Sequence, residues 1–299
     1  MGDLFNRYAT ISVRRTDRIT IAGKTIINLL GETRVIRDLR ISFKVEKTSE
    51  SSPNTGTISI YNMNPISRSR FSSDKSFLEL TAGYASGTRL TDLIAIPGTQ
   101  KIFSGFVKKA VTEKVGGDIV TTIEAGDGVS FTESAVINKA FAQGTPYAII
   151  FAALAATFSL PMIPSPAATA ILSTKLTTTG YSAYGMTRAI LDKLTEGLGL
   201  EWSIQDGNLL VTERGGSLLT SLVILEEDTG LVGVPKKTTK GVEFTSLLNP
   251  KIVVKSKVSV ISKFVTGIFV ANKVTHEGDT HGSKWETQVE GVGLGLSLP

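Results

Sequence analysis

Near the start of the chain stand AGY (82–84), IFSG (102–105) and GDIVTTIE (117–124), and near its end stand GIFV (267–270), VTHEGD (274–279) and WETQVE (285–290). Each set predicts a strand, a turn rich in glycine and aspartate, and a returning strand that alternates apolar residues with Thr, Gln or Glu. The two sets look like two versions of one β module. Because a repeat within one chain can double the symmetry of an oligomer, the pattern indicates architecture rather than chemistry.

The composition bounds the class of protein. A chain of 299 residues, 41% hydrophobic and 20% charged, is long enough for two or three domains with cores of their own. It has no cysteine, which excludes disulfides and thiolate chemistry. The amino terminus lacks a basic-then-apolar signal pattern, and the longest apolar run, 147–160, is roughly 14 residues, short of the ~20 that cross a bilayer. We expect a soluble protein made inside the cell, without stable membrane insertion.

The net charge of +5 is concentrated at the amino end. Up to Lys47 there are ten basic and five acidic residues, so this stretch carries the whole excess. The basic residues alternate with Val35, Ile36, Leu39 and Ile41, as on the solvent face of strands. A solvated face or a surface for an acidic protein partner fits this pattern. A specific nucleic-acid site would need exposed aromatics between the charges or a known motif, and we do not expect one.

Residues 1–128 predict a first antiparallel β-barrel domain, in which strict alternation over 39–46 places Leu39, Ile41, Phe43 and Val45 on one face. The other predicted strands are 9–14, 18–21, 25–30, 57–61, 77–82, 100–113 and 119–125, with a possible short helix at 67–72. Closure into a barrel would also remove exposed sheet edges.

Residues 129–229 predict a small α+β middle domain of two helices and a hairpin. Thr145 is the expected N-cap and Pro146 the first residue of a buried apolar helix through about Phe158. A second helix should begin at Tyr181 or Ser182 and stop at Gly197 and Gly199. The hairpin joins 200–204 to 208–212 through Asp206-Gly207.

Residues 230–299 predict a second barrel. Its expected strands are 231–235, 241–248, 251–261, 267–276 and 284–291, with a lysine-rich loop at 236–240, and we predict that the tail 291–296 is too flexible for a strand centre. The predicted fold class is therefore mainly β, with two tube-like antiparallel β-barrel domains flanking a small α+β middle domain.

We find no catalytic, cofactor or metal site in the sequence. His276, Glu277, Asp279 and His281 are the one cluster with metal-ligand side chains, but they surround a predicted hairpin tip where Asp and Gly serve turn geometry. The alternative is a metal site, which requires ligands on rigid elements. These two histidines are the only ones in the chain, so the sequence offers almost no candidate for the histidine base of a Ser-His-Asp or Cys-His catalytic site.

Three other patterns also have simpler explanations. Glu226-Glu227-Asp228 reads as a charged turn, because the paired carboxylates of a glycosidase flank the sugar from separate elements. Gly291, Gly293 and Gly295 are not part of a strand-then-helix phosphate loop. Trp202 and Trp285 lie in alternating strands and are expected in a core or an interface.

A co-linear set of short motifs resembles bacteriophage tail baseplate hub proteins over roughly the whole chain. The motifs are 39–45, Pro53-Asn54, 58–62, Arg68, 82–84, 102–105, 190–192, 200–204, 207–211, 229–235, 247–250, 274–280 and 285–291. One departure is 251–257 (KIVVKSK), where relatives often have a glycine turn, so the barrel edge is expected to differ there. The modest length is more similar to that of hubs of contractile tails than to that of the longer tail-tip proteins of non-contractile phages.

The resemblance implies a structural, non-enzymatic hub located in the virion tail baseplate and assembled in the host cytoplasm. It would form a trimeric ring with pseudo-sixfold symmetry that joins the sixfold tail tube to the threefold central spike. The implied partners are two further copies of the chain, the spike, the tube, and the baseplate wedge and tape measure proteins. The competing hypotheses are a tail-associated peptidoglycan hydrolase and a receptor- or glycan-binding tail-tip protein.

Overall fold

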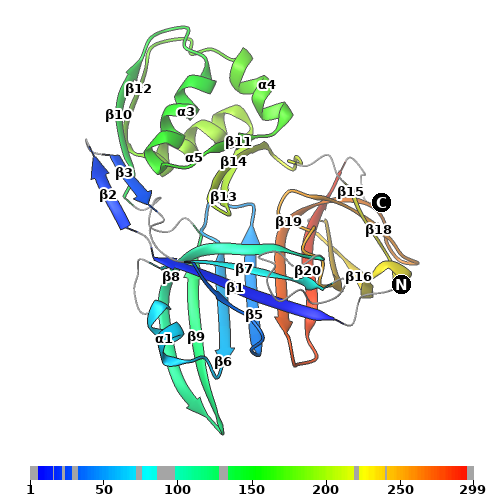
Figure 1. The fold of residues 1–299 in the computed structure, drawn as a ribbon. Coiled ribbons are helices and arrows are strands. Elements are labelled where there is room, and N and C mark those ends of the chain that lie inside the picture. Colours follow the sequence, from blue (N-terminus) through cyan, green and yellow to red (C-terminus); the bar gives the residue numbers. More distant parts are fainter. Residues whose placement is uncertain are drawn as a thin grey trace.

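The computed structural model describes residues 6–15, 17–21, 24–28, 33–71, 76–85, 98–127, 134–218, 222–239 and 241–294, and for 17–21 and 24–28 the backbone only. These residues form two β lobes side by side and a smaller lobe with helices above them (Figure 1). The protein is mainly β with large antiparallel sheets and few helices, as the sequence predicts.

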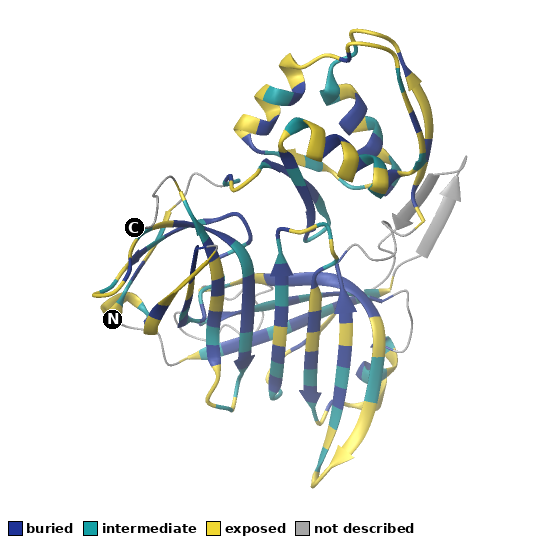
Figure 2. Ribbon diagram, turned by 180° about the vertical axis from the view of Figure 1, so that it is seen from behind, coloured by how far each residue is buried: buried dark blue, intermediate teal, exposed yellow. Residues whose placement is uncertain are grey.

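The first β lobe follows the predicted strands closely. It contains β1 (Arg7–Arg15), β2 (Asp17–Ile21), β3 (Lys24–Asn28), β4 (Arg34–Ile36), β5 (Ile41–Thr48), β6 (Thr55–Tyr61), α1 (Pro65–Arg68), the 3-10 turn η1 (Ser69–Phe71), β7 (Ser76–Tyr84), β8 (Thr99–Val115) and β9 (Asp118–Gly126). On β5, Ile41, Phe43 and Val45 are buried while Lys44 is exposed, the period-2 pattern visible as stripes in Figure 2. The alternating sequence thus fixes which face of the sheet meets the core.

The second β lobe begins before the predicted position. It contains β15 (Leu222–Glu226), the 3-10 turn η2 (Glu227–Thr229), β16 (Leu231–Thr238), β17 (Gly241–Leu247), β18 (Lys257–Ile261), β19 (Thr266–Asp279) and β20 (Trp285–Gly293). Strand β15 was not predicted, and it pairs in parallel with β18. Residues 236–238 lie in β16 rather than in a loop.

The predicted strand over 251–261 is wrong in its first half. Only Lys257–Ile261 is a strand, because 249–256 form a loop in which Lys255 adopts a left-handed conformation with φ of 66°. Such a φ normally favours glycine, and it interrupts the alternation that the sequence suggested. This loop falls on the segment 251–257, where the motif departs from the resemblance.

The two β lobes repeat one pairing pattern, as the sequence repeat predicts. In the first, β5 pairs with β6, β6 with β9, β9 with β8 and β8 with β7. In the second, β16 pairs with β17, β17 with β20, β20 with β19 and β19 with β18. The chain order is the same in both sets. We call β5–β9 the first unit and β16–β20 the second unit.

The two units join edge to edge into one continuous sheet. Residues 42–48 of β5 pair with 273–279 of β19, so the sheet runs β16-β17-β20-β19-β5-β6-β9-β8 and continues through β7 and β1 to β4. Each unit keeps its own hydrophobic cluster beneath this sheet. Trp285 of the second unit packs into the cluster of the first, with its ring 5.4 Å from that of Phe43 in an edge-on arrangement. The joint is therefore both hydrogen-bonded and apolar.

The middle lobe packs three helices against short strands. It contains β10 (Val136–Phe141), α3 (Tyr147–Phe158), β11 (Met162–Pro164), α4 (Pro166–Thr174), β12 (Tyr181–Met186), α5 (Thr187–Leu198), β13 (Leu200–Gln205) and β14 (Asn208–Glu213). The predicted hairpin is β13–β14, turned by Asp206 and Gly207 with φ of 51° and 79°. Positive φ at both turn positions matches the twist of the strands that it joins.

Several details of this lobe differ from the predictions. Pro146, not Thr145, is the N-cap of α3, and the Thr145 hydroxyl donates to the Ala142 carbonyl instead. One face of α3 is open to solvent, with Ile149 52% exposed, so the helix is not buried all round. Helix α5 begins at Thr187 rather than Tyr181, because 181–186 pair with β10 as strand β12. Helix α4, capped by Ser165, was not predicted.

Candidate functional site

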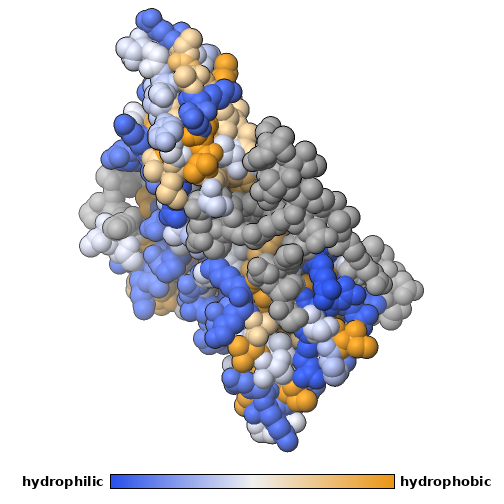
Figure 3. All heavy atoms as spheres, turned by 90° about the vertical axis from the view of Figure 1, so that its left-hand side faces the viewer, coloured by the Kyte–Doolittle hydropathy of each residue, from blue (hydrophilic) through white to orange (hydrophobic). Residues whose placement is uncertain are grey.

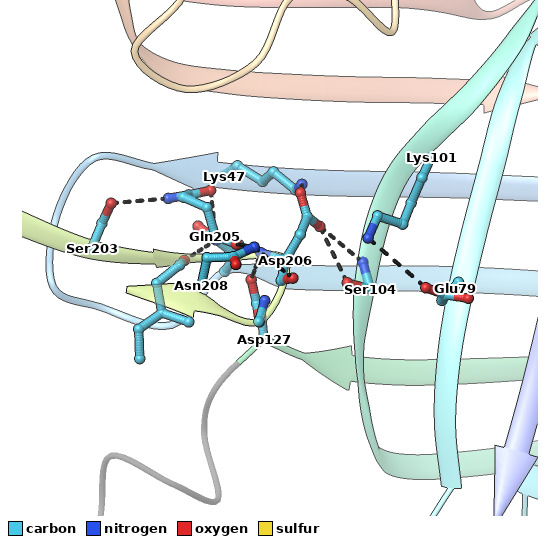
Figure 4. Close-up of polar contacts among 12 residues, drawn as sticks. Lys47, Glu79, Lys101, Ser104, Asp127, Ser203, Gln205, Asp206 and Asn208 are labelled. Carbon is cyan, nitrogen blue, oxygen red and sulfur yellow. Dashed lines mark hydrogen bonds and ion pairs between the residues drawn. The ribbon is translucent and has the colours of Figure 1, made fainter. Parts of the chain in front are cut away.

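The tip of the β13–β14 hairpin contacts the sheet of the first unit and ties the middle lobe to it (Figure 4). Lys47 of β5 is only 3% exposed, and its ammonium lies 2.6 Å from a carboxylate oxygen of Asp206 at the tip. The other oxygen of that carboxylate accepts from the backbone N–H of Ser104 on β8, at 3.1 Å. A buried lysine and a turn aspartate thus fix where the hairpin meets the sheet.

A second carboxylate holds the hairpin from the other side. Asp127, at the end of β9, accepts hydrogen bonds from the backbone N–H groups of Asp206 and Gly207. Burial and the nearby charge of Asp206 raise the pKa of Asp127 to about 6, against the opposing effect of Lys47. Around pH 6 the charge at this contact therefore changes.

Amide side chains complete the contact. The Asn54 side chain donates to the Ile204 carbonyl at 2.8 Å and to the Gln205 side chain at 3.0 Å, while Gln205 donates to the Thr48 carbonyl at 2.7 Å. The loop between β5 and β6 and the hairpin tip therefore satisfy each other's buried polar groups.

The second unit holds the same hairpin through another buried lysine. The Lys255 side chain is 2% exposed, and its ammonium contacts the carboxylate of Glu201 on β13 and the Asn272 side-chain oxygen on β19, the latter at 3.1 Å. One lysine from each β lobe therefore pairs with one acid of the hairpin. We call Lys47, Asp127, Glu201, Asp206 and Lys255 the hairpin junction.

The predicted turn cluster at 276–281 is corrected at His276. This residue lies inside β19 and is 1% exposed, and its Nδ1 is 2.9 Å from the Thr287 hydroxyl. Burial, together with the charge of Lys47, lowers the pKa of His276 to about 3, although a backbone hydrogen bond with Ile252 opposes this. The imidazole is neutral and belongs to the strand, not to a solvated turn.

Of the rest of this cluster, Glu277 and Asp279 lie at the end of β19, and only His281 lies in the turn. Asp279 forms a salt bridge with Arg40 at 2.8 Å, Glu277 pairs with Lys284 at 2.7 Å, and His281 is exposed. The described part of the chain contains no group of three His, Asp or Glu side chains placed to hold a metal ion.

The other singled-out residues fall mostly where the sequence places them. Glu227 and Asp228 form the 3-10 turn η2, and Trp202 and Trp285 are each 3% exposed. Gly291 and Gly293 lie in β20, which extends further than predicted, while Gly295 lies outside the described residues. In the described ranges no helix is long and apolar enough to cross a bilayer.

The basic amino-terminal stretch is not a uniform solvated face. Lys47 is buried, whereas Arg15 is exposed and Arg14 lies 3.3 Å from Glu79. Lys47 continues the inward positions of Ile41, Phe43 and Val45, and a lysine at an inward position was the signal in the sequence that could have revealed it. Nothing comparable marks Lys255, whose position depends on the unpredicted loop.

Comparisons with known proteins agree with this architecture. The family model described as Baseplate hub gp41 matches residues 21–291. No curated protein matches the chain.

Among solved structures, a 43 kDa tail protein of prophage MuSo2 from Shewanella oneidensis aligns with a TM-score of 0.61 and 9% identity, covering 94% of this chain and 96% of the other. A tail protein from Neisseria meningitidis aligns with 0.58 and 11% identity, covering 95% and 96%. An E. coli component of the type VI secretion system, described as similar to the T4 bacteriophage tail proteins gp27 and gp5, aligns with 0.55 and 10% identity, covering 85% and 73%. At these identities the likeness concerns the fold. The family match covers most of the chain, and the protein therefore belongs to the Baseplate hub gp41 family of phage tail structural proteins.

Proposed function

We propose that this hub protein forms a trimeric ring with pseudo-sixfold symmetry that joins the sixfold tail tube to the threefold central spike. The observation that carries the proposal is the repeat of the strand order β5–β9 in β16–β20. One chain supplies two similar units, so three chains present six of them to a sixfold partner. The same three chains retain true threefold symmetry toward a spike.

The hairpin junction supports the proposal by setting the geometry of the chain. Lys47 of the first unit and Lys255 of the second hold one hairpin through Asp206 and Glu201. Buried charges of this kind are costly to separate, so the middle lobe stays at a defined position over the joint between the two units. A part that must match two partners of different symmetry benefits from such rigidity.

The remaining features of the proposal follow from the family. The protein acts in the tail baseplate without catalysis, and its partners besides the spike and tube are wedge and tape measure proteins. Assembly occurs in the host cytoplasm, and the tail is contractile. We also propose that the chain is divided into a first barrel (1–128), a middle domain (129–229) and a second barrel (230–299), and that the middle segment contributes β15 to the second barrel.

The test is the copy number and symmetry of the protein in assembled tails. Electron cryomicroscopy of purified tails should show three copies in a closed ring between tube and spike. Any other copy number contradicts the proposal. A dye-release assay on bacterial cell walls tests the absence of catalysis, and wall degradation that one carboxylate substitution abolishes would contradict that part.

A further inference from the structure

The outer half of β8 has a free edge. One edge of β8 pairs with β7 only as far as Phe106, while residues 106–115 pair with β9 on the opposite edge. Within the described residues no strand pairs with the β7 side of 108–115. Val115 at the end of this segment is 59% exposed, and the β8–β9 hairpin projects beyond the rest of the sheet (Figure 1). We call 108–115 the open edge.

The same segment of the second unit is covered. Residues 266–270 of β19 pair with β18, and 273–279, along the same edge, pair with β5 of the first unit. In the repeat, β19 corresponds to β8 and β18 to β7. The joint between the two units therefore shows what kind of strand the open edge accepts.

Two β-bulges fix the correspondence residue by residue. In β8 the register with β9 shifts between Val107 and Lys109, and in β19 the register with β20 shifts between Ala271 and Lys273. The lysine after each bulge lies opposite a glutamate of the returning strand, Lys109 opposite Glu124 and Lys273 opposite Glu290. Bulges are specific features of a strand, so two bulges at matching positions set the alignment of β8 with β19.

Strand β16 is the counterpart of β5, and it also has a free edge. In the described chain β16 pairs with β17 alone and ends the sheet. Val232 and Val234 on it are 41% and 58% exposed. The eight strands from β16 to β8 place this edge and the open edge at opposite ends of one run, and the two do not pair within the described chain (Figure 1).

We propose that β16 of one copy adds to the open edge of β8 of the next copy, antiparallel, as β5 adds to β19 within a chain. The inference rests on the proposed ring and specifies which edges close it. Each copy offers one edge of each kind, and three such contacts close a ring. Closure also covers two exposed strand edges that would otherwise promote uncontrolled association.

The transferred register brings opposite charges together. In the joint Glu277 lies opposite Lys44, where Glu277 pairs with Lys284 and Lys44 with Glu46. Glu113 takes the place of Glu277, and Lys236 takes the place of Lys44, so Glu113 of one copy faces Lys236 of the next. Both side chains are exposed in the single chain. On the side of the molecule that carries β8, hydrophobic residues are scattered among hydrophilic ones, which suits recognition by backbone pairing and charge (Figure 3).

Cysteine cross-linking tests the register, since the natural chain has no cysteine. Directly opposed residues of an antiparallel pair have Cα atoms roughly 4.5–5.5 Å apart, within reach of a disulfide or a short bismaleimide. A chain carrying both Glu113→Cys and Lys236→Cys should yield covalent trimers from assembled tails, and a mixture of the two single variants should yield dimers. Each single variant alone should yield monomers. A matched control moves the second cysteine to Ile261, which is 42% exposed on β18 outside the proposed contact, and should not cross-link to position 113.

Charge reversal supplies the second measurement. Glu113→Lys or Lys236→Glu alone should lower the yield of assembled tails, and the two together should restore it, while the melting temperature of the isolated chain stays unchanged. If three-copy rings form but the 113–236 pair does not cross-link, the strand assignment is wrong and the proposed ring stands. If tails contain no three-copy ring, the proposed function fails as well.

Discussion

The long strands β8 and β19 have the same place in the two units but opposite surroundings beyond their bulges. His276 of β19 is buried and neutral beneath the joint, whereas its counterpart Thr112 on β8 is exposed. Strand β5 of the same chain pairs with 273–279 of β19, while no strand of the described chain pairs with the corresponding edge of β8 at 108–115. The repeat thus specifies the same strand in both units. The outer half of β19 is paired because the first unit supplies β5.

The largest loss of stability is expected from substitutions at the hairpin junction, to which each unit contributes one buried lysine. Lys47→Met and Lys255→Met each leave a carboxylate without its buried cation, and each should lower the free energy of unfolding by on the order of 3 kcal/mol. Urea unfolding followed by circular dichroism measures the change. Lys284→Met is the matched control, because Lys284 is exposed and its pair with Glu277 should contribute little to stability. Equal losses in all three variants would show that the junction does not hold the units.

The next largest loss of stability is expected at a position where β8 and β19 carry different residues. Gly105 of β8 corresponds to Phe269 of β19, and a Cβ at position 105 would lie 2.7 Å from the Gly126 carbonyl oxygen. Gly105→Val should therefore cost about 1–3 kcal/mol or more and reduce the soluble yield. Thermal unfolding measures it. Gly117→Ala, with no atom within 4 Å of the added Cβ, is the control and should be nearly neutral. A stable Gly105→Val variant would contradict the close approach of β8 and β9.

A smaller, pH-dependent effect distinguishes covered β19 from open β8. The pKa of His276 is lowered to about 3, so below about pH 6.5 the unfolded chain binds a proton that the folded chain does not, and stability falls as pH falls toward 3. The pKa of Asp127 is raised to about 6, so the folded chain binds the extra proton between about pH 6 and 4 and stability rises there. The shift of His276 is the larger, and the net effect is a loss of stability on acidification.

Melting temperatures from pH 7 to 4.5 test this balance. His276→Asn should flatten the acid-side loss, whereas Asp127→Asn should steepen it. His281→Asn, in the exposed turn, is the control and should leave the profile unchanged. If His276→Asn retains the full acid sensitivity, the imidazole is not buried and the cover by β5 is incomplete.

The smallest effect should arise from the lysine that follows the bulge in β19. Lys273 pairs with Glu290 at 2.9 Å, with side chains 41% and 59% exposed. Glu290→Gln should lower the free energy of unfolding by about 0–1 kcal/mol, and 1 M salt should abolish most of the difference. Glu124→Gln, opposite Lys109 on β8, should behave alike in an isolated chain. A large effect in β19 alone would mean that the joint strengthens this pair beyond simple surface electrostatics.

Much of the fold was predictable because alternation and turn residues act locally. The strand boundaries of β5, β8 and β9, the extent of α3 and the Asp206-Gly207 turn follow from neighbouring residues. Strand β12 was mistaken for the start of a helix, because its strand state depends on pairing with β10, 40 or more residues earlier in the chain. Of the hairpin junction, the sequence marked Asp206 as a turn residue only, since its partners come from three distant segments.

The sequence by itself determined that the chain is mainly β, that its two ends carry versions of one module, and that it resembles baseplate hubs. These properties follow from residue periodicity, turn chemistry and motif order, which are all present in the linear chain. Only the tertiary structure decided that β5 joins β19, that Lys47, Lys255 and His276 are buried, and which strand edges stay open. Strand pairing across the units uses backbone groups common to every residue, and Phe43 and Trp285, whose rings meet at the joint, lie far apart in the sequence. The local pattern therefore does not reveal which strands become neighbours.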